Sequence, residues 1–572
     1  MSRSTPINRR TVLRTTLGLG IGLAATPLLT ACGDGAAAGK STAKNRSALP
    51  ATVPANSVRA DLPGTPAGVP NGFYTYPRTP VRSVRGTPLK GARPVRAMTE
   101  TFAPPGAARD KNAAWQAIEK RLGGTVDVVA VAADDYPAKF STMVAGGDLA
   151  DVFMYPETGG VDQKAAFLAA TCADLTPFLG GDAVKAYPNL AAIPATAWQQ
   201  GLYGDKLYGV PITRWGTAGA GFYRHDLFRQ VGVDSLDEIT DLERFFEVCK
   251  ELTRPKKQQY AIVAGATTML AMSAGAPYAW AMDRKTGKFT VDLETDEYRS
   301  AVETAARLYE AGCYYPGTLA MSGAQKAQYT DLFKNGRGAY VFDGIPAYLQ
   351  PSTGYVDAMA AIDKSFDVRP FVPVGAKAVS WTNNATLSQS YLKKASEERV
   401  EQVLRLLDFI AAPFGTEEYT LITYGVEGTD HRRDARGNPV LTEQGSQDVA
   451  VPWGKLASGV PALFSTTSQD AVRHVHEAYT RMIPKLVQAD FLNYTSPTWD
   501  SKGSGSLATL KLDGLKDIIS GRKSMKDYDA LVKDYLAKGG EKCRGEFEEA
   551  AQKESAQKES AQKEAARKGA GQ

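Results

Sequence analysis

The chain has 572 residues, of which 43% are hydrophobic and 23% are charged, a composition typical of globular proteins with two or more domains. Its formal net charge of +5 is small for this length and is spread along the chain, so the sequence lacks the basic surface that nucleic-acid binding requires. Beyond the N-terminal region, no segment approaches the ~20 apolar residues of a membrane-spanning helix.

The N-terminal residues follow the order of parts of an export signal. Arg9 and Arg10 form a twin-arginine charged segment, and an apolar, glycine-rich run follows over residues 17–29. That run is too short to span a bilayer, and it ends in the sequence LTAC, which resembles a bacterial lipobox. In a lipobox, signal peptidase cuts before the cysteine and the thiol carries a diacylglycerol. We therefore predict a signal peptide over residues 1–31 and lipidation of Cys32.

The export route stays open, because Asn8 stands where a twin-arginine signal usually has Ser or Thr. Either the twin-arginine or the general secretion route gives a protein anchored to the outer face of the cell membrane. The several acyl chains of a diacylated, N-acylated cysteine hold a protein stably, at ~0.8 kcal/mol per buried methylene. Residues 32–92 are rich in Ala, Gly, Pro, Ser and Thr without a periodic apolar pattern, and we predict a flexible tether there.

Strand and helix patterns alternate at the start of the folded body. We predict strands over residues 95–102, 126–131 and 151–155, with helices over residues 112–122 and 136–144 between them. This order indicates a parallel sheet with crossover helices, and ligands bind such sheets at the carboxyl ends of the strands. Tyr155 and Glu157 fall at that edge.

The remainder of the chain contains more helix patterns. Apolar residues at three- and four-residue spacing predict helices over residues 236–252, 296–310 and 396–411, so the body is α/β. Near the C-terminus the sequence AQKES recurs, and it has no apolar face of its own. We therefore expect residues 541–572 to form a charged tail, either a solvated helix or a disordered segment.

Two motifs resemble those of a known family. Residues 207–212 read LYGVPI and residues 221–228 read GFYRHDLF. Together they resemble the first interlobe crossing of the family 1 extracellular solute-binding proteins, the relatives of maltose-binding protein. Residues 332–348 are similar to the family segment that leads back to the first lobe, and residues 424–428 resemble a segment of its lipoprotein branch. The resemblance spans roughly residues 95–538.

The resemblance implies a two-lobed, periplasmic-binding-protein-like (type II) fold with a hinge between the lobes. The implied ranges are residues 93–212 for the first lobe, 213–340 for the second lobe, 341–388 for the return to the first lobe, and 389–540 for C-terminal helices of the second lobe. Contacts from both lobes to a ligand exist together only in the closed state, so binding shifts the population towards closure. We expect a monomer whose closed form is recognised by the permease subunits of an ABC importer.

The resemblance also implies positions in the cleft. Tyr155 stands where maltose-binding protein has a sugar-stacking Trp, and Glu157 lies near a position that holds a hydroxyl-binding Asp. Tyr278, with Trp280 close behind, matches a Pro-Tyr element that lines the cleft of the family. Asp343 opens a segment that aligns with a Gly-Pro-Trp sequence, but the Trp is absent here, which argues against maltodextrin as the ligand.

Three further residues are predicted from their placement near strands alone: Trp215, Trp381 and Asn383. Flat aromatic faces beside hydrogen-bonding side chains suit a sugar, because sugars present C–H faces that stack on rings and hydroxyls that need paired donors and acceptors. For any single Tyr or Trp, packing in the core is the commoner role, and a carboxylate is as often a surface group or a helix cap. The prediction of an oligosaccharide ligand therefore rests on the whole cluster, and peptides and polyols stay open.

Other chemistries lack support in the sequence. A glycine-rich stretch at residues 35–41 is one residue short of a phosphate loop and follows no strand, and no GxSxG motif occurs. His474 and His476 point to different faces of a helix, so they form no zinc site. We predict no cofactor and assign no metal ligands, and a structural calcium ion stays open. The alternatives are a surface adhesion lipoprotein and a secreted glycoside hydrolase, which needs two carboxylates about 5–9.5 Å apart. Crossing motifs serve closure rather than a fixed active site, so we predict a binding protein and not an enzyme.

Overall fold

The structure is a computed structural model that describes residues 42–44, 46–54, 58–102, 104, 106–157, 159–161, 163–214, 216–217, 219–321, 325–351, 353–382 and 385–569. The predicted signal peptide and Cys32 lie outside the described residues, as do Trp215 and Asn383. All the described residues belong to one contact unit, residues 39–572. Among the described helices, none is both long and apolar enough for a membrane crossing.

A five-stranded sheet organises the first lobe, in the order β4-β3-β5-β16-β8. The strands are β3 (Val95–Thr101), β4 (Val126–Ala132), β5 (Val152–Met154), β8 (Gly209–Thr213) and β16 (Thr386–Leu392). β3 is parallel to β4 and β5, whereas β16 runs antiparallel to β5 and β8. The carboxyl ends of β3, β4, β5 and β8 therefore share one edge with the amino end of β16.

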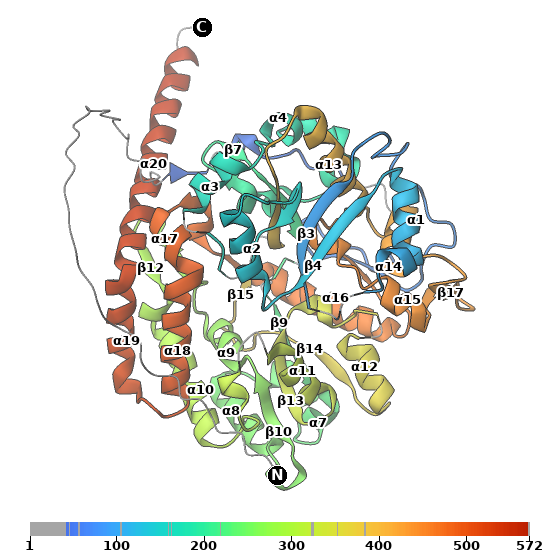
Figure 1. The fold of residues 1–572 in the computed structure, drawn as a ribbon. Coiled ribbons are helices and arrows are strands. Elements are labelled where there is room, and N and C mark those ends of the chain that lie inside the picture. Colours follow the sequence, from blue (N-terminus) through green and yellow to red (C-terminus); the bar gives the residue numbers. More distant parts are fainter. Residues whose placement is uncertain are drawn as a thin grey trace, which may run out of the picture. The chain divides into compact units, whose positions relative to one another are not determined.

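Two crossover helices join the parallel strands as the sequence predicts. They are α1 (Ala113–Leu122) and α2 (Tyr136–Ala145), which Figure 1 shows beside β3 and β4. α1 begins where the side chain of Asn112 accepts a hydrogen bond from the backbone N–H of Trp115, and it ends at Gly123, whose φ of 71° suits glycine. The strand–helix–strand prediction for this region is confirmed.

A four-stranded sheet, in the order β10-β13-β9-β14, organises the second lobe. Its strands are β9 (Ala220–Arg224), β10 (Tyr260–Ala264), β13 (Gly338–Asp343) and β14 (Val368–Phe371). The main helices around it are α8 (Leu242–Leu252), α9 (Ala266–Ala274), α10 (Asp296–Glu310) and α11 (Lys326–Lys334). The predicted helix over residues 236–252 is divided, because Asp241 is extended and caps α8 by accepting from the backbone N–H of Arg244.

The chain crosses between the two sheets at places that agree only in part with the predicted ranges. The first crossing lies between β8 and β9, at the first motif. The return comes later than residue 341, because β14 pairs antiparallel with β9 and keeps the chain in the second lobe until β16. Helix α13 (Glu397–Ile410) then packs in the first lobe, where Leu404 shares a core with Val95 and Ile118. The range 389–540 is therefore divided between the lobes.

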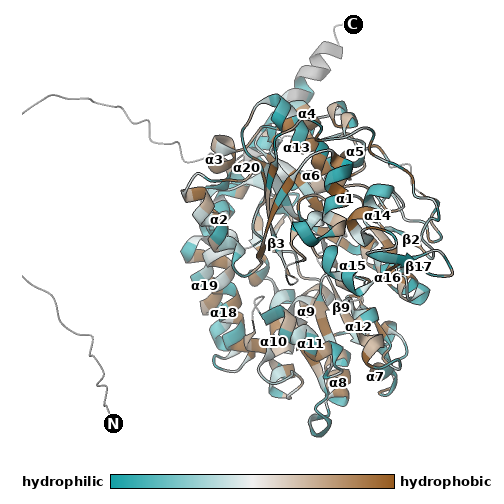
Figure 2. Cartoon of the chain, turned by 45° about the vertical axis from the view of Figure 1, so that its right-hand side comes forward, coloured by the Kyte–Doolittle hydropathy of each residue, from teal (hydrophilic) through white to brown (hydrophobic). Residues whose placement is uncertain are grey.

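The C-terminal helices pack against the second lobe. They are α16 (Gln469–Met482), α17 (Pro497–Lys502), α18 (Ala508–Ile519), α19 (Tyr528–Tyr535) and α20 (Glu541–Gly569). Helices α17 to α20 lie together in Figure 1, and Figure 2 shows hydrophilic and hydrophobic residues alternating along α18 and α19, as expected of amphipathic helices. In α20, Cys543, Phe547 and Ala550 have no exposed surface. The first turns of the predicted tail therefore belong to the core, whereas most of the side chains described in the following repeats, up to Lys563, are exposed.

The predicted tether also differs from the structure over most of its length. Phe73 and Tyr76 are buried against Phe414, and β2 (Asn71–Phe73) runs parallel to β19 (Ala462–Phe464). Further along, Leu89 has only 1% of its surface exposed and packs in the first-lobe core. Isolated apolar residues in irregular backbone carry no period, so a search for periodicity does not detect this kind of packing.

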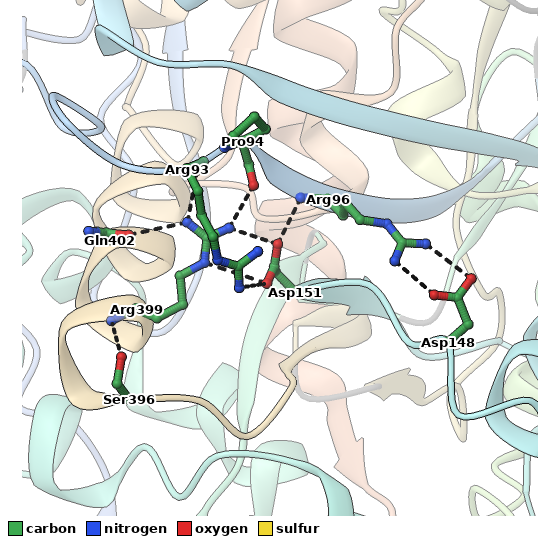
Figure 3. A network of polar contacts seen from close by, with 8 residues as sticks. All are labelled: Arg93, Pro94, Arg96, Asp148, Asp151, Ser396, Arg399 and Gln402. Carbon is green, nitrogen blue, oxygen red and sulfur yellow. Dashed lines mark hydrogen bonds and ion pairs between the residues drawn. The ribbon is translucent and has the colours of Figure 1, made fainter.

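A buried ion-pair network joins α13 to the first-lobe sheet (Figure 3). Arg399 donates to Asp151 at 2.8 Å and to the backbone oxygens of Arg93 and Pro94 at 3.0 and 2.8 Å. Asp151 also accepts from the backbone N–H of Arg96 at 2.9 Å. Burial alone would raise the pKa of Asp151, but the hydrogen bonds from Arg399 and Arg96 outweigh it and hold this pKa below its ordinary value.

Candidate functional site

A cavity of about 1380 Å³ lies at the edge where the first sheet presents its carboxyl ends. Its wall includes Tyr155 after β5, Arg214 after β8 and Thr386 at the start of β16. The second sheet contributes Asp343, the last residue of β13. Parallel strands end at a common edge, which explains why residues far apart in the sequence meet here.

Another cavity of about 840 Å³ is lined by residues such as Arg82, Tyr187 and Arg405. None of its lining residues comes from the described part of the second sheet. The larger cavity is therefore the candidate site, because a ligand there can contact both lobes.

Tyr155 lines the cavity, but its ring is already well packed. Its ring centroid lies 5.4 Å from that of Phe140 and 5.9 Å from that of Tyr391, in edge-to-face arrangements. The ammonium of Lys164 lies 3.9 Å from the centroid of the Tyr155 ring, and the hydroxyl accepts from the backbone N–H of Val161. With 7% of its surface exposed, Tyr155 offers a ligand only a small contact unless Lys164 moves.

Glu157 belongs to a cluster of charges on the cavity wall. The ammonium of Lys455 lies 3.6 Å from the carboxylate of Glu157 and 3.2 Å from that of Glu100. Burial, together with a hydrogen bond to Glu157, raises the pKa of Glu100 to about 8. Glu100 therefore holds its proton at neutral pH, and Lys455 pairs with Glu157.

Arg214 directly follows β8 and faces the cavity. Its backbone N–H donates to the carbonyl of Ala385 at 2.7 Å, which continues the pairing of β8 with β16. Within the part of the chain that the structure describes, its guanidinium makes no hydrogen bond and no ion pair. Burial lowers the pKa of Arg214, and the carboxylates of Glu157 and Asp343 partly offset this effect. The group stays charged, because an arginine keeps its proton in proteins.

Asp343 lines the cavity and is already fully engaged. Its carboxylate accepts from the hydroxyl of Tyr355 at 2.9 Å and from the backbone N–H of Gly344 at 2.6 Å. The ammonium of Lys326 in α11 lies 2.5 Å away. Asp343 therefore fixes α11 to β13, and it has little capacity left for a ligand.

The three predicted aromatic residues of the second part of the chain have different positions. Tyr278 lines the cavity and stacks on Trp381, with ring centroids 5.1 Å apart and planes inclined by 10°. Trp381 lies behind it and donates its indole N–H to the carbonyl of Ala276. Trp280 has no exposed surface and packs edge-on against Phe547 of α20. Of the three, only Tyr278 presents surface to the cavity, and Trp280 is a core residue.

Sequence reasoning missed several residues of the cavity wall. Arg214 is the neighbour of Trp215, so a charged residue directly after a buried strand was a signal that could have found it. Phe491 and Trp499 also line the cavity, with ring centroids 4.8 Å apart. Phe491 lies in a 3-10 turn and Trp499 in α17, where no motif marks either residue as part of a site.

The described residues hold no group of three His, Cys, Asp or Glu side chains that could bind a metal ion. Four cysteines, Cys172, Cys249, Cys313 and Cys543, are buried free thiols. Burial raises the pKa of each of these thiols, which makes them poor nucleophiles. The polar groups of the cavity are therefore suited to hold a ligand by hydrogen bonds and charge.

Known proteins similar to this chain include two from Bacillus subtilis (strain 168). The polygalacturonan/rhamnogalacturonan-binding protein YtcQ is 22% identical over 468 residues, which cover 77% of this chain and 88% of YtcQ. Lipoprotein LipO is 22% identical over 356 residues, which cover 57% of this chain and 65% of LipO.

A solved structure has the same fold. The N-glycan transport solute binding protein NgtS from Streptococcus pneumoniae superposes with a TM-score of 0.59 at 14% identity, over 81% of this chain and 98% of NgtS. In addition, the profile of a protein family described as bacterial extracellular solute-binding protein matches residues 113–427, more than half of the chain. This chain therefore belongs to the family of bacterial extracellular solute-binding proteins.

Proposed function

We propose that the protein captures an oligosaccharide outside the cell and delivers it to the permease subunits of an ABC importer. The observation that carries the proposal is the cavity of about 1380 Å³ whose wall takes residues from both sheets. Its volume exceeds the ~300–1,000 Å³ of pockets for small molecules, so it suits several sugar rings. The names of YtcQ and NgtS, which describe a polygalacturonan/rhamnogalacturonan-binding protein and an N-glycan transport protein, support a saccharide ligand.

Capture requires that the lobes move, and the connections between them allow a hinge. One connection is the short segment between β8 and β9, and a second is the longer segment between β14 and β16, which contains β15 (Ser380–Thr382). Hinge motion concentrates in such element termini, which absorb changes in backbone angles. A ligand that contacts both Tyr278 and the carboxyl end of β5 would stabilise the closed state.

The carboxylates of the cavity favour binding over hydrolysis. A glycoside hydrolase needs one carboxyl group as acid and a second, free carboxylate across the scissile bond. Here Glu157 pairs with Lys455, Asp343 pairs with Lys326, and Glu100 has 3% of its surface exposed. Each of these three acids is therefore engaged or buried, and we propose that the bound saccharide leaves unchanged.

We also propose that the protein is a lipoprotein anchored through Cys32. The LTAC sequence after the apolar run supports this anchor, and so does the name of the relative LipO. Metabolic labelling with a palmitate analogue in a Gram-positive expression host tests it. Label that is incorporated into the wild-type protein and lost in Cys32→Ala supports the anchor, and label that persists in Cys32→Ala contradicts it.

Binding is tested with the folded body on a panel of neutral and acidic oligosaccharides. A ligand at a hundredfold excess over its Kd should stabilise the body by ~2.7 kcal/mol, which appears as a higher Tm. Small-angle scattering of the same sample should show a smaller radius of gyration, and chromatography should recover the ligand intact. A panel without any thermal shift, or a steady release of shorter sugars, would refute capture.

A further inference from the structure

We infer that the cavity recognises an acidic oligosaccharide, and that Arg214 binds the carboxylate of one uronic acid residue. The inference rests on the proposed function, because it names the class of sugar that the same cavity takes. It depends on one observation, a guanidinium in the cavity wall that the described chain leaves without a partner.

Three arginines with little exposed surface have carboxylate partners. Arg399 pairs with Asp151 at 2.8 Å, and the guanidinium of Arg224 binds Asp226 through two hydrogen bonds of 2.6 and 2.7 Å. Arg121 pairs with Glu418 at 2.9 Å. Arg214 is half-buried in the cavity wall, and a partly desolvated charge without a partner is costly. Its presence in a binding cavity indicates that the ligand supplies the partner.

The acidic groups that act electrostatically on Arg214 are each neutralised, by another cation or by a retained proton. Glu157 has Lys455 at 3.6 Å, and Asp343 has Lys326 at 2.5 Å. Glu100 retains its proton at neutral pH, because burial and its hydrogen bond to Glu157 raise its pKa. The group formed by these six side chains therefore has an excess of one positive charge, which matches the single negative charge of a uronate.

The position of Arg214 suits recognition of a sugar carboxylate. It follows β8 at the edge where β3, β4 and β5 also end, so its backbone is fixed by the sheet. A planar guanidinium binds a carboxylate through two parallel hydrogen bonds, which gives orientation as well as charge. Tyr278, stacked on Trp381, offers a flat face in the same cavity for a neighbouring sugar ring.

Calorimetry with trigalacturonate and trimannuronate, each beside its methyl ester, tests the inference. Esterification removes the negative charge and changes little else in the sugar. We expect the wild-type protein to bind one of the acids ~10–100-fold more tightly than its ester, the effect of a hydrogen-bonded charge. Arg214→Gln should lose this preference. The control Arg307→Gln should keep it, because Arg307 pairs with Glu243 at the surface.

The outcomes separate this inference from the proposed function. Equal binding of acid and ester, or a preference for a neutral sugar such as maltotriose, would overturn the acidic ligand and leave capture of oligosaccharides intact. A preference for acid that survives in Arg214→Gln would overturn the role of Arg214. A folded wild-type protein that binds none of these sugars would count against both proposals.

Discussion

Two arginines of the first lobe, the buried Arg399 and the half-buried Arg214, show how differently a protein uses the same group. The five N–H groups of Arg399 all find acceptors, in Asp151, Gln402 and the backbone oxygens of Arg93 and Pro94. Arg214 finds none among the described residues. The fold uses the first arginine to hold α13 on the sheet. The second contributes little to the fold, which leaves it available for a ligand.

The largest effect is expected when the ion pair between Arg399 and Asp151 is broken. Asp151→Ala leaves Arg399 charged and buried, and removing one member of such a pair costs about 3–5 kcal/mol. Urea unfolding followed by circular dichroism should show a free energy of unfolding lower by this amount. Arg214→Gln should leave this free energy unchanged or slightly higher. An Asp151→Ala protein as stable as the wild type would remove the distinction between the two arginines.

A second variant changes the charge next to Arg214 inside the cavity. Lys455→Met frees the carboxylate of Glu157, which can then pair with Arg214. We expect the affinity for an acidic trisaccharide to fall about tenfold, because the ligand must compete with Glu157 for the guanidinium. Affinity for a neutral sugar should change much less. Calorimetry on both ligands measures this, and a tighter complex with the acid would contradict it.

The pH dependence of stability should differ in sign between the two sites. The pKa of Glu100 is raised from 4.5 to about 8 in the folded state, so folding retains a proton and stability falls as pH rises across this interval. The pKa of Asp151 is lowered, so its contribution is present above its ordinary value of 3.8 and is lost as pH falls through the folded value.

Glu100→Gln should therefore flatten the stability profile between about pH 4.5 and pH 8, and Asp151→Asn should flatten it in acid. Thermal unfolding across this pH range tests both variants. A Glu100→Gln protein whose stability still falls between these pH values would show that another group is responsible.

The smallest effect is expected at the surface. In the outer part of α20, Lys563 pairs with Glu559 along the exposed helix. Such pairs contribute about 0.3–0.5 kcal/mol each, so deletion of residues 559–572 should change the free energy of unfolding by less than ~1 kcal/mol. Phe547→Ala, in the buried turns of the same helix, should cost ~3–5 kcal/mol. Equal losses in the two variants would contradict the division of α20 into a core part and a solvated part.

The sequence predicts the first three strands of the first sheet because local patterns determine them. β3, β4 and β5 appear within a few residues of their predicted bounds, and this places Tyr155 and Glu157 correctly at the cavity. The later boundaries depend on pairing between distant segments. The addition of β14 to β9 joins residues that are more than a hundred positions apart, and no local pattern marks such a contact.

The aromatic residues show a second reason why the sequence alone does not predict the whole site. Tyr278 and Trp280 are two positions apart, yet one lines the cavity and the other is enclosed by α20. Between them Ala279 adopts a positive φ of 54°, which turns the chain and changes the direction of the next side chain. A single sequence does not reveal this turn, so it predicts a cavity position equally for Tyr278 and for Trp280.

The packing of the N-terminal segment has a consequence for the reach of the protein. The described body begins at β1 (Thr42–Ala43), which pairs with β21 (Tyr494–Thr495). With Cys32 lipidated as proposed, only about ten residues link the bilayer to the body, and an extended chain spans ~3.3–3.6 Å per residue. This linker is then at most ~35 Å long. So short a linker limits how far the body can move from the lipid surface, which raises its local concentration near a membrane transporter.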